Sequence, residues 1–196
     1  MIINTVDGLI KRLGNKKRRL FNINKSVRDL FELTNDQLPL NGEVFKLISL
    51  TGGFSSISFI KAVAKKEIII ELTASTLRIG EKQFKYLSEL KNTGRLESAL
   101  FFIGALMKTD NDKDDKYNYY QKFNKICNEN SWKRVIVNNH SKVILMRTEK
   151  NYYILETSSN LNENPKIEQY SFENDYSLYE FYYNFFQALK EVKEFE

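Results

Sequence analysis

The sequence has 196 residues, a length that fits one domain of ordinary size. Hydrophobic residues make up 42% of it and aromatic residues 13%, which is enough to bury a core and excludes a wholly disordered chain. The single cysteine, Cys127, excludes a fold stapled by internal disulfides, and we expect it to be a buried helix residue. The longest apolar run, 99–107, is too short to cross a membrane, and no secretory signal is apparent, so a cytoplasmic location is expected.

The net charge of +5 is concentrated near the start of the chain. Residues 1–20 carry six basic side chains against Asp7, and the rest of the chain is balanced. The basic residues are Lys11, Arg12, Lys16, Lys17, Arg18 and Arg19. Such a strip suits the phosphate backbone of a nucleic acid, although a solubilising arm is the plainer interpretation. We therefore divide the chain into a basic appendage or first elements at 1–40 and a main domain at 41–196.

The main domain alternates strand and helix patterns in chain order. Strands are expected at 44–50, 67–73, 96–107 and 134–137, with helices at 54–64, 81–90 and 117–128 between them. Beyond His140 the expected elements are strands at 142–146, 152–156 and 167–172, and then a helix at 178–192. The core stripe of this last helix is expected to be Phe181, Phe185, Phe186 and Leu189. This order predicts an α/β/α sandwich with a mixed, partly parallel sheet.

The chain contains one histidine, and a lysine follows it two residues later. We expect His140 at the end of a strand, with Lys142 on the same extended segment, so their side chains should point to the same face. A cation beside an imidazole disfavours a zinc site and favours a phosphate. The alternative is an isolated surface or core histidine without a chemical role.

Further motifs follow in order. Ser158-x-Asn160 comes after the expected hairpin, and Glu168 lies downstream of it. Together with His140-x-Lys142, they resemble the active-site signature of the phospholipase D superfamily, over roughly residues 40–190. The resemblance implies a phospholipase D-like fold. It also implies the nuclease-like subtype, whose members have one motif per chain.

Two positions depart from the family pattern. Arg147 stands where the family usually has aspartate, and Thr157 stands where it has the glycine before the serine. The aspartate is often described as structural, so its loss affects the family name more than the chemistry. The threonine could alter the turn and narrow the pocket. A catalytically inactive member, serving to bind DNA or in assembly, is therefore an alternative.

The resemblance implies a metal-independent and cofactor-free phosphodiesterase. In that mechanism, His140 attacks phosphorus to give a phosphohistidine, while Lys142, Ser158 and Asn160 bind the phosphoryl oxygens. Glu168 would orient the imidazole through its other nitrogen. The reaction needs a second histidine to protonate the leaving oxygen, and the chain has one. Members with one motif act as homodimers, so we expect two subunits to share one site.

Nucleic acid is the expected substrate, with DNA favoured over RNA. The groups expected to bind it are Lys16, Lys17, Arg18, Arg19 and Arg78. Arg78 belongs to the polar segment 75–78, which follows an expected strand and could line a groove or begin a helix. A role in phospholipid processing is the weaker alternative, because no amphipathic or membrane-anchoring segment is evident, and no membrane partner is expected.

Overall fold

The structure is a computed structural model that describes residues 18–24, 30, 34, 36–50, 54–109, 118–162 and 166–194. Its strands are β1 (Arg18–Asn24), β2 (Glu43–Ser49), β3 (Ile69–Thr76), β4 (Leu96–Gly104), β5 (Lys133–Val137), β6 (Val143–Arg147), β7 (Tyr152–Thr157) and β8 (Glu168–Asn174). Its helices are α2 (Ser56–Lys66), α3 (Glu81–Asn92), α4 (Leu106–Thr109), α5 (Tyr119–Glu129) and α6 (Tyr176–Glu194).

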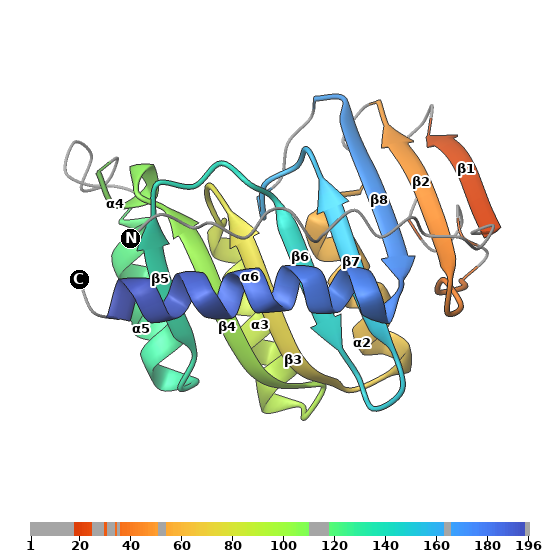
Figure 1. The fold of residues 1–196 in the computed structure, drawn as a ribbon. Coiled ribbons are helices and arrows are strands. Elements are labelled where there is room, and N and C mark those ends of the chain that lie inside the picture. Colours follow the sequence, from red (N-terminus) through yellow and green to blue (C-terminus); the bar gives the residue numbers. More distant parts are fainter. Residues whose placement is uncertain are drawn as a thin grey trace, which may run out of the picture.

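The strands form one mixed sheet in the order β1-β2-β8-β7-β6-β3-β4-β5. Strands β3, β4 and β5 are parallel, whereas β6, β7 and β8 alternate in direction beside them. Helix α6 crosses one face of the sheet, and α2, α3 and α5 lie on the other (Figure 1). The expected α/β/α sandwich is confirmed. Strand β1 pairs in parallel with β2, so the sheet extends into the first 40 residues.

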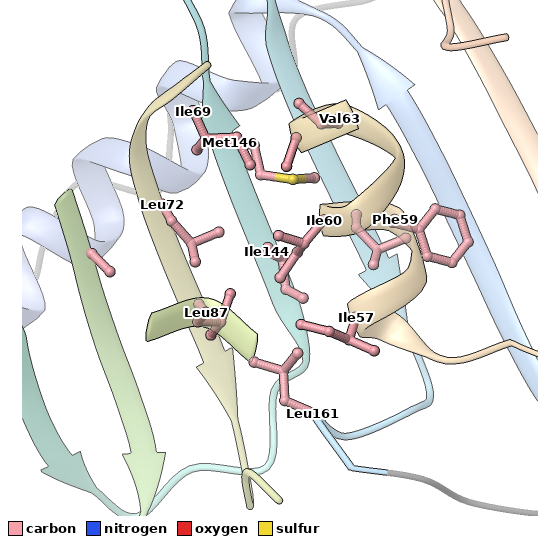
Figure 2. Packing of buried hydrophobic residues seen from close by; sticks show 14 of the residues in the cluster. Ile57, Phe59, Ile60, Val63, Ile69, Leu72, Leu87, Ile144, Met146 and Leu161 are labelled. Carbon is pink, nitrogen blue, oxygen red and sulfur yellow. The ribbon is translucent and has the colours of Figure 1, made fainter. Parts of the chain in front are cut away.

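The larger core lies between the sheet and α2 and α3. Ile57, Ile60 and Val63 of α2 recur at helical spacing and face Ile144 and Met146 of β6 (Figure 2). Each of these five side chains is at most 6% exposed. Fully burying one such aliphatic side chain stabilises a fold by roughly 1.5–3 kcal/mol. The hydrophobic spacing of the sequence therefore places α2 where it holds β6 in the middle of the sheet.

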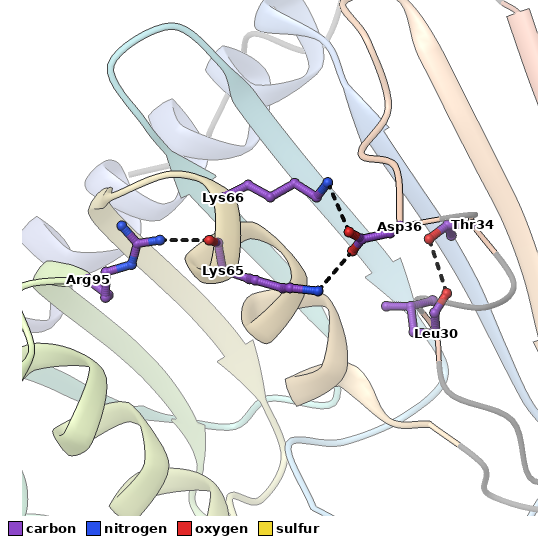
Figure 3. A network of polar contacts seen from close by, with 6 residues as sticks. All are labelled: Leu30, Thr34, Asp36, Lys65, Lys66 and Arg95. Atoms are coloured by element: carbon purple, nitrogen blue, oxygen red, sulfur yellow. Dashed lines mark hydrogen bonds and ion pairs between the residues drawn. The ribbon is translucent and has the colours of Figure 1, made fainter.

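Polar contacts cap the C-terminal end of α2 (Figure 3). Arg95 donates from Nη2 to the Lys65 carbonyl at 2.7 Å and from Nε to the Ala64 carbonyl at 2.7 Å. Asp36 pairs with Lys65 at 3.3 Å and with Lys66 at 3.5 Å. The carbonyls at a helix C-terminus have no partner inside the helix, so the Arg95 bonds satisfy two of them. The exposed ion pairs contribute little to stability.

A glycine ends α3. Gly94 has φ +70°, and the N–H of Arg95 donates to the Leu90 carbonyl at 2.8 Å. This left-handed residue closes the helix in a Schellman motif. The chain then turns directly into β4.

Two expectations about elements are wrong. The strand expected at 96–107 ends at Gly104, because residues 106–109 turn into the short helix α4. In α6, Phe181 is 45% and Phe185 is 55% exposed, whereas Tyr179 is 3% and Phe186 is 2% exposed. Residues 179, 182, 183, 186 and 189 share the face toward the sheet, which turns Phe181 and Phe185 toward solvent.

Candidate active site at one end of the sheet

All five expected catalytic residues lie at one end of the sheet. Strands β3, β4, β5 and β7 finish at this end, and β6 and β8 begin there. His140 and Lys142 precede β6, Ser158 and Asn160 follow β7, and Glu168 is the first residue of β8. The Thr157 N–H donates to the Lys142 carbonyl at 3.1 Å, which joins the first two segments. We call this region, formed by residues 139–142, 158–161 and 168, the site end.

His140 and Lys142 are in contact, although the strand expected at 142–146 begins one residue later. His140 is exposed in the connection between β5 and β6. Lys142 Nζ lies 3.3 Å from His140 Nδ1 and donates to the His140 carbonyl at 2.9 Å. Because an ammonium can only donate, a hydrogen bond here requires the imidazole tautomer that is protonated on Nε2 and has a lone pair on Nδ1.

Ser158 and Glu168 are hydrogen-bonded across the ends of β7 and β8. The hydroxyl of Ser158 donates to the Glu168 carboxylate and also accepts the N–H of Gln169 at 3.0 Å. Glu168 is 6% exposed, whereas Ser158 is exposed. The Ser158 O–H therefore points toward the buried carboxylate, and its oxygen stays at the exposed surface of the site end. A bond from Glu168 to the imidazole of His140 stays a prediction.

Asn160 lies on the β3 side of the site end. Its Oδ1 is 3.4 Å from the hydroxyl of Thr76, which also accepts the Leu161 N–H at 3.1 Å and donates to the Arg78 carbonyl at 2.8 Å. Thr76 is 1% exposed. One buried hydroxyl thus joins the 158–161 loop to the end of β3.

The base of this loop is also fixed from α2. Ser56 donates to the Ser159 carbonyl at 3.1 Å, and the Tyr170 hydroxyl donates to the Phe54 carbonyl at 3.2 Å. Burial raises the pKa of Tyr170 to about 12, so the phenol stays a neutral donor. The loop that carries Ser158 and Asn160 is therefore hydrogen-bonded through its backbone to the start of α2.

The structure adds a group that the sequence did not single out. Asn139, Ser75 and Ser141 are mutually hydrogen-bonded beside His140. The polar residues at the end of the strand that contains Ser75 indicate a site there. Their hydrogen-bond partners, however, depend on β3 lying beside β6. That adjacency is a property of the sheet order.

Among the expected nucleic-acid-binding residues, Arg78 is exposed and follows β3 at the site end. Arg18 and Arg19 begin β1, which is the outer strand beside β2. Lys16 and Lys17 lie outside the described residues.

The two departures from the family pattern have different surroundings. Arg147 is the last residue of β6, about 13 Å along the strand from Val143, and its Nε lies 3.3 Å from the Glu71 carboxylate. Arg147 is therefore remote from the site end. Thr157 is at the site end, where its hydroxyl accepts the Ser159 N–H at 2.9 Å. This bond shapes the turn at the position of the family's glycine.

Three other properties bear on the chemistry. Cys127 is buried as expected, and burial raises the pKa of its thiol to about 12, so it is unreactive. Within the described ranges, the acidic, cysteine and histidine side chains form no group of three or more that could hold a metal ion. In the same part of the chain, no helix combines the length and apolarity needed to cross a membrane.

The sequence matches no protein-family model and no curated protein. The fold does resemble solved structures. A polyphosphate kinase from Porphyromonas gingivalis is 12% identical with a TM-score of 0.55, over 76% of this chain and 24% of that one. A phosphatidylserine synthase from Haemophilus influenzae Rd KW20 is 15% identical with a TM-score of 0.46, over 77% of this chain and 37% of that one.

The likeness to polyphosphate kinase concerns the fold. This chain spans about a quarter of that enzyme. The mixed α/β sheet that the two proteins share agrees with the α/β/α fold that the resemblance of the motifs implied.

Proposed function

We propose that this protein is a metal-independent phosphodiesterase of the phospholipase D superfamily that cleaves nucleic acid. The observation that carries the proposal is the meeting of His140, Lys142, Ser158, Asn160 and Glu168 at one end of the sheet. These residues come from three separate segments of the chain. Their types supply a nucleophile, a cation and neutral hydrogen-bond donors, which metal-free phosphoryl transfer requires.

The proposed reaction has two steps. An imidazole nitrogen of His140 attacks phosphorus, the phosphohistidine bond forms, and the bond from phosphorus to the leaving oxygen breaks as that oxygen takes a proton from a second histidine. Water then attacks phosphorus, the phosphorus–nitrogen bond breaks, and the second histidine accepts the proton of the water. A bound phosphodiester competes for Lys142, which frees the imidazole from the ammonium beside it.

The second histidine is proposed to be His140 of another copy of the chain. The sequence has one histidine, so a single subunit cannot supply both the nucleophile and the acid. Two apolar side chains flank the site end and suit a subunit contact: Leu106 is 53% and Ile167 is 68% exposed. A two-fold axis through this end of the sheet would bring two copies of His140 to one phosphate.

A nucleic acid is the proposed substrate because the excess charge lies in one strip near Arg18 and Arg19. Neutralising Lys16, Lys17, Arg18 and Arg19 together should weaken nucleic-acid binding. The slope of log affinity against log salt should fall by up to about three units. Hydrolysis of a small soluble diester should be unchanged. An unchanged salt slope would make the strip a solubility feature.

The proposal as a whole is tested by a nuclease assay in EDTA. The wild-type protein should cleave DNA under these conditions, and His140→Ala should not. Cleavage that requires a divalent ion would place the active site elsewhere. Salt-sensitive DNA binding without any cleavage would favour the inactive binding module instead.

A further inference from the structure

The chain segment that carries His140 is fixed on both sides of the histidine. The side-chain oxygen of Asn139 accepts the backbone N–H of Ser141 at 2.8 Å and the Ser141 hydroxyl at 2.9 Å. Asparagine commonly closes a turn through such a bond to the backbone two residues ahead. The residues immediately before and after His140 are therefore held together in one turn.

The same asparagine binds this turn to two strands. Its Nδ2 donates to the Phe102 carbonyl of β4 at 3.1 Å and to the Ser75 hydroxyl of β3 at 2.9 Å. Ser75 is 1% exposed, and its oxygen lies 2.6 Å from that of Ser141. Asn139, Ser75 and Ser141 thus form a closed ring of hydrogen bonds, anchored in the buried ends of the strands.

Glycine at the end of β4 permits this close approach. A Cβ atom at Gly104 would lie 3.0 Å from the Asn139 carbonyl oxygen and 2.9 Å from that of Leu77. A side chain there would push the 138–142 segment away from the strand. The backbone of β4 and the turn before His140 are therefore fitted to each other.

We infer that Asn139 is a positioning residue that sets the direction of the His140 side chain. The imidazole is exposed, so packing does not hold the ring; its direction depends on the backbone of this turn together with the Lys142 contact. An amide at position 139 is required because one atom donates to β3 and β4 while the other accepts from Ser141. This inference rests on the proposed function for its kinetic consequence, although the positioning itself does not depend on catalysis.

Asn139→Asp tests the inference with a nearly isosteric change. The carboxylate retains the acceptor toward Ser141 but places an oxygen opposite the Phe102 carbonyl, where the amide nitrogen now donates. Asn138→Asp is the matched control, because it makes the same change of charge at the exposed neighbouring residue. Misplacement of a reacting group by about 1 Å costs on the order of 100-fold in rate. We expect a kcat loss of about that size in Asn139→Asp, with KM changed less than about threefold.

The second measurement is the ¹H–¹⁵N spectrum of the imidazole. The chain has a single histidine, so His140 gives the only imidazole signals. Asn139→Asp should shift or multiply these signals, whereas Asn138→Asp should leave them in place. If thermal melting shows that Asn139→Asp does not fold, Ser141→Ala replaces it, because this change removes only the hydroxyl bonds. Its expected kcat loss is about tenfold.

The outcomes separate the two proposals. Equal kcat losses in the position-139 and position-138 variants, or ring signals that stay unchanged at position 139, would overturn the positioning role. If the wild-type protein hydrolyses no phosphodiester, the proposed function fails. The imidazole spectra alone then test whether Asn139 positions His140. Shifted signals in Asn139→Asp alone would then still support the positioning of His140.

Discussion

The two ends of the central strands use the same kinds of side chain for opposite purposes. At the site end, His140 and Ser158 are exposed to solvent. At the far end, where β6 finishes and β7 begins, the Glu67 carboxylate accepts hydrogen bonds from Thr148 at 2.6 Å and from Tyr153 at 2.6 Å. Those two residues are each 2% exposed. A hydroxyl–carboxylate pair therefore lies at the exposed surface at one end, through Ser158, and is enclosed in the fold at the other.

The far end is closed by further bonds. Asn151 donates from Nδ2 to both Glu67 oxygens at 3.0 Å, and Asn174 donates to Asn151 Oδ1 at 2.8 Å. The Asn174 oxygen accepts the Tyr152 N–H at 3.1 Å. A satisfied polar network of this kind stabilises one arrangement of strands. The comparison predicts that substitutions at the two ends affect activity and stability separately.

The largest effect is expected from His140→Ala. If His140 is the nucleophile, its removal should lower phosphodiester hydrolysis by more than about 10⁴-fold. The free energy of unfolding should change by less than about 0.5 kcal/mol, because the side chain is exposed. Substrate hydrolysis and urea titration measure the two quantities. Near-normal hydrolysis by this variant would remove the catalytic assignment.

Lys142→Ala is expected to have the next largest effect. The ammonium is proposed to stabilise charge on the phosphoryl oxygens, and loss of one such group costs on the order of 10²–10³ in kcat. Lys125→Ala is the control, because that lysine is on α5 with a 77% exposed side chain. Steady-state rates of both variants on one small diester make the comparison. Equal rates would show that Lys142 has no electrostatic role.

Glu67→Ala should have the reverse pattern, with stability lost and activity kept. The substitution removes the acceptor of three donors, and an unsatisfied buried donor costs about 1–3 kcal/mol. We expect a loss of about 2–4 kcal/mol in the free energy of unfolding. Chemical denaturation measures the loss, and kcat should stay within about twofold when the variant is folded. A large kcat change in folded protein would contradict the separation of the two ends.

The same carboxylate predicts a pH dependence. Burial alone would raise the pKa of Glu67, but the hydrogen bonds from Thr148, Tyr153 and Asn151 outweigh it and lower the pKa. A lowered pKa in the folded state means that this stabilisation is complete above the ordinary glutamate pKa of about 4.3. It is lost as the pH falls through the lowered value. Glu67→Gln should flatten this acid-side decline in stability, measured by denaturation between neutral and acid pH.

Arg147→Asp is expected to have the smallest effect. This variant installs the family's aspartate, but at a position opposite Glu71 in the β3–β6 pairing. Two carboxylates facing each other across strands should destabilise the fold by about 1 kcal/mol. Activity should not rise, because the residue lies at the far end. An increase in kcat would show that an aspartate at position 147 affects activity despite its distance from the site end.

The sequence predicts the elements better than it predicts their neighbours. Helical spacing predicts α2, and the motif residues His140 and Ser158 lie at the same end of the sheet. Local patterns could not show that β3 lies beside β6, so the bonds from Ser75 and Thr76 were not foreseen. An amphipathic stripe through Phe181, Phe185 and Leu189 predicts burial of all three. The orientation of α6 on the sheet decides which row is covered, and it leaves Phe181 and Phe185 exposed.

The most direct test of the account is a search for a covalent intermediate on His140. The protein would be quenched in alkali during turnover of a nucleic-acid substrate in EDTA, and its peptides would be analysed by mass spectrometry. The account predicts a nucleotidyl adduct on the peptide that contains His140, present during turnover and absent in His140→Ala. Rapid turnover in EDTA with an adduct on another residue, or at an equal rate in His140→Ala, would contradict it.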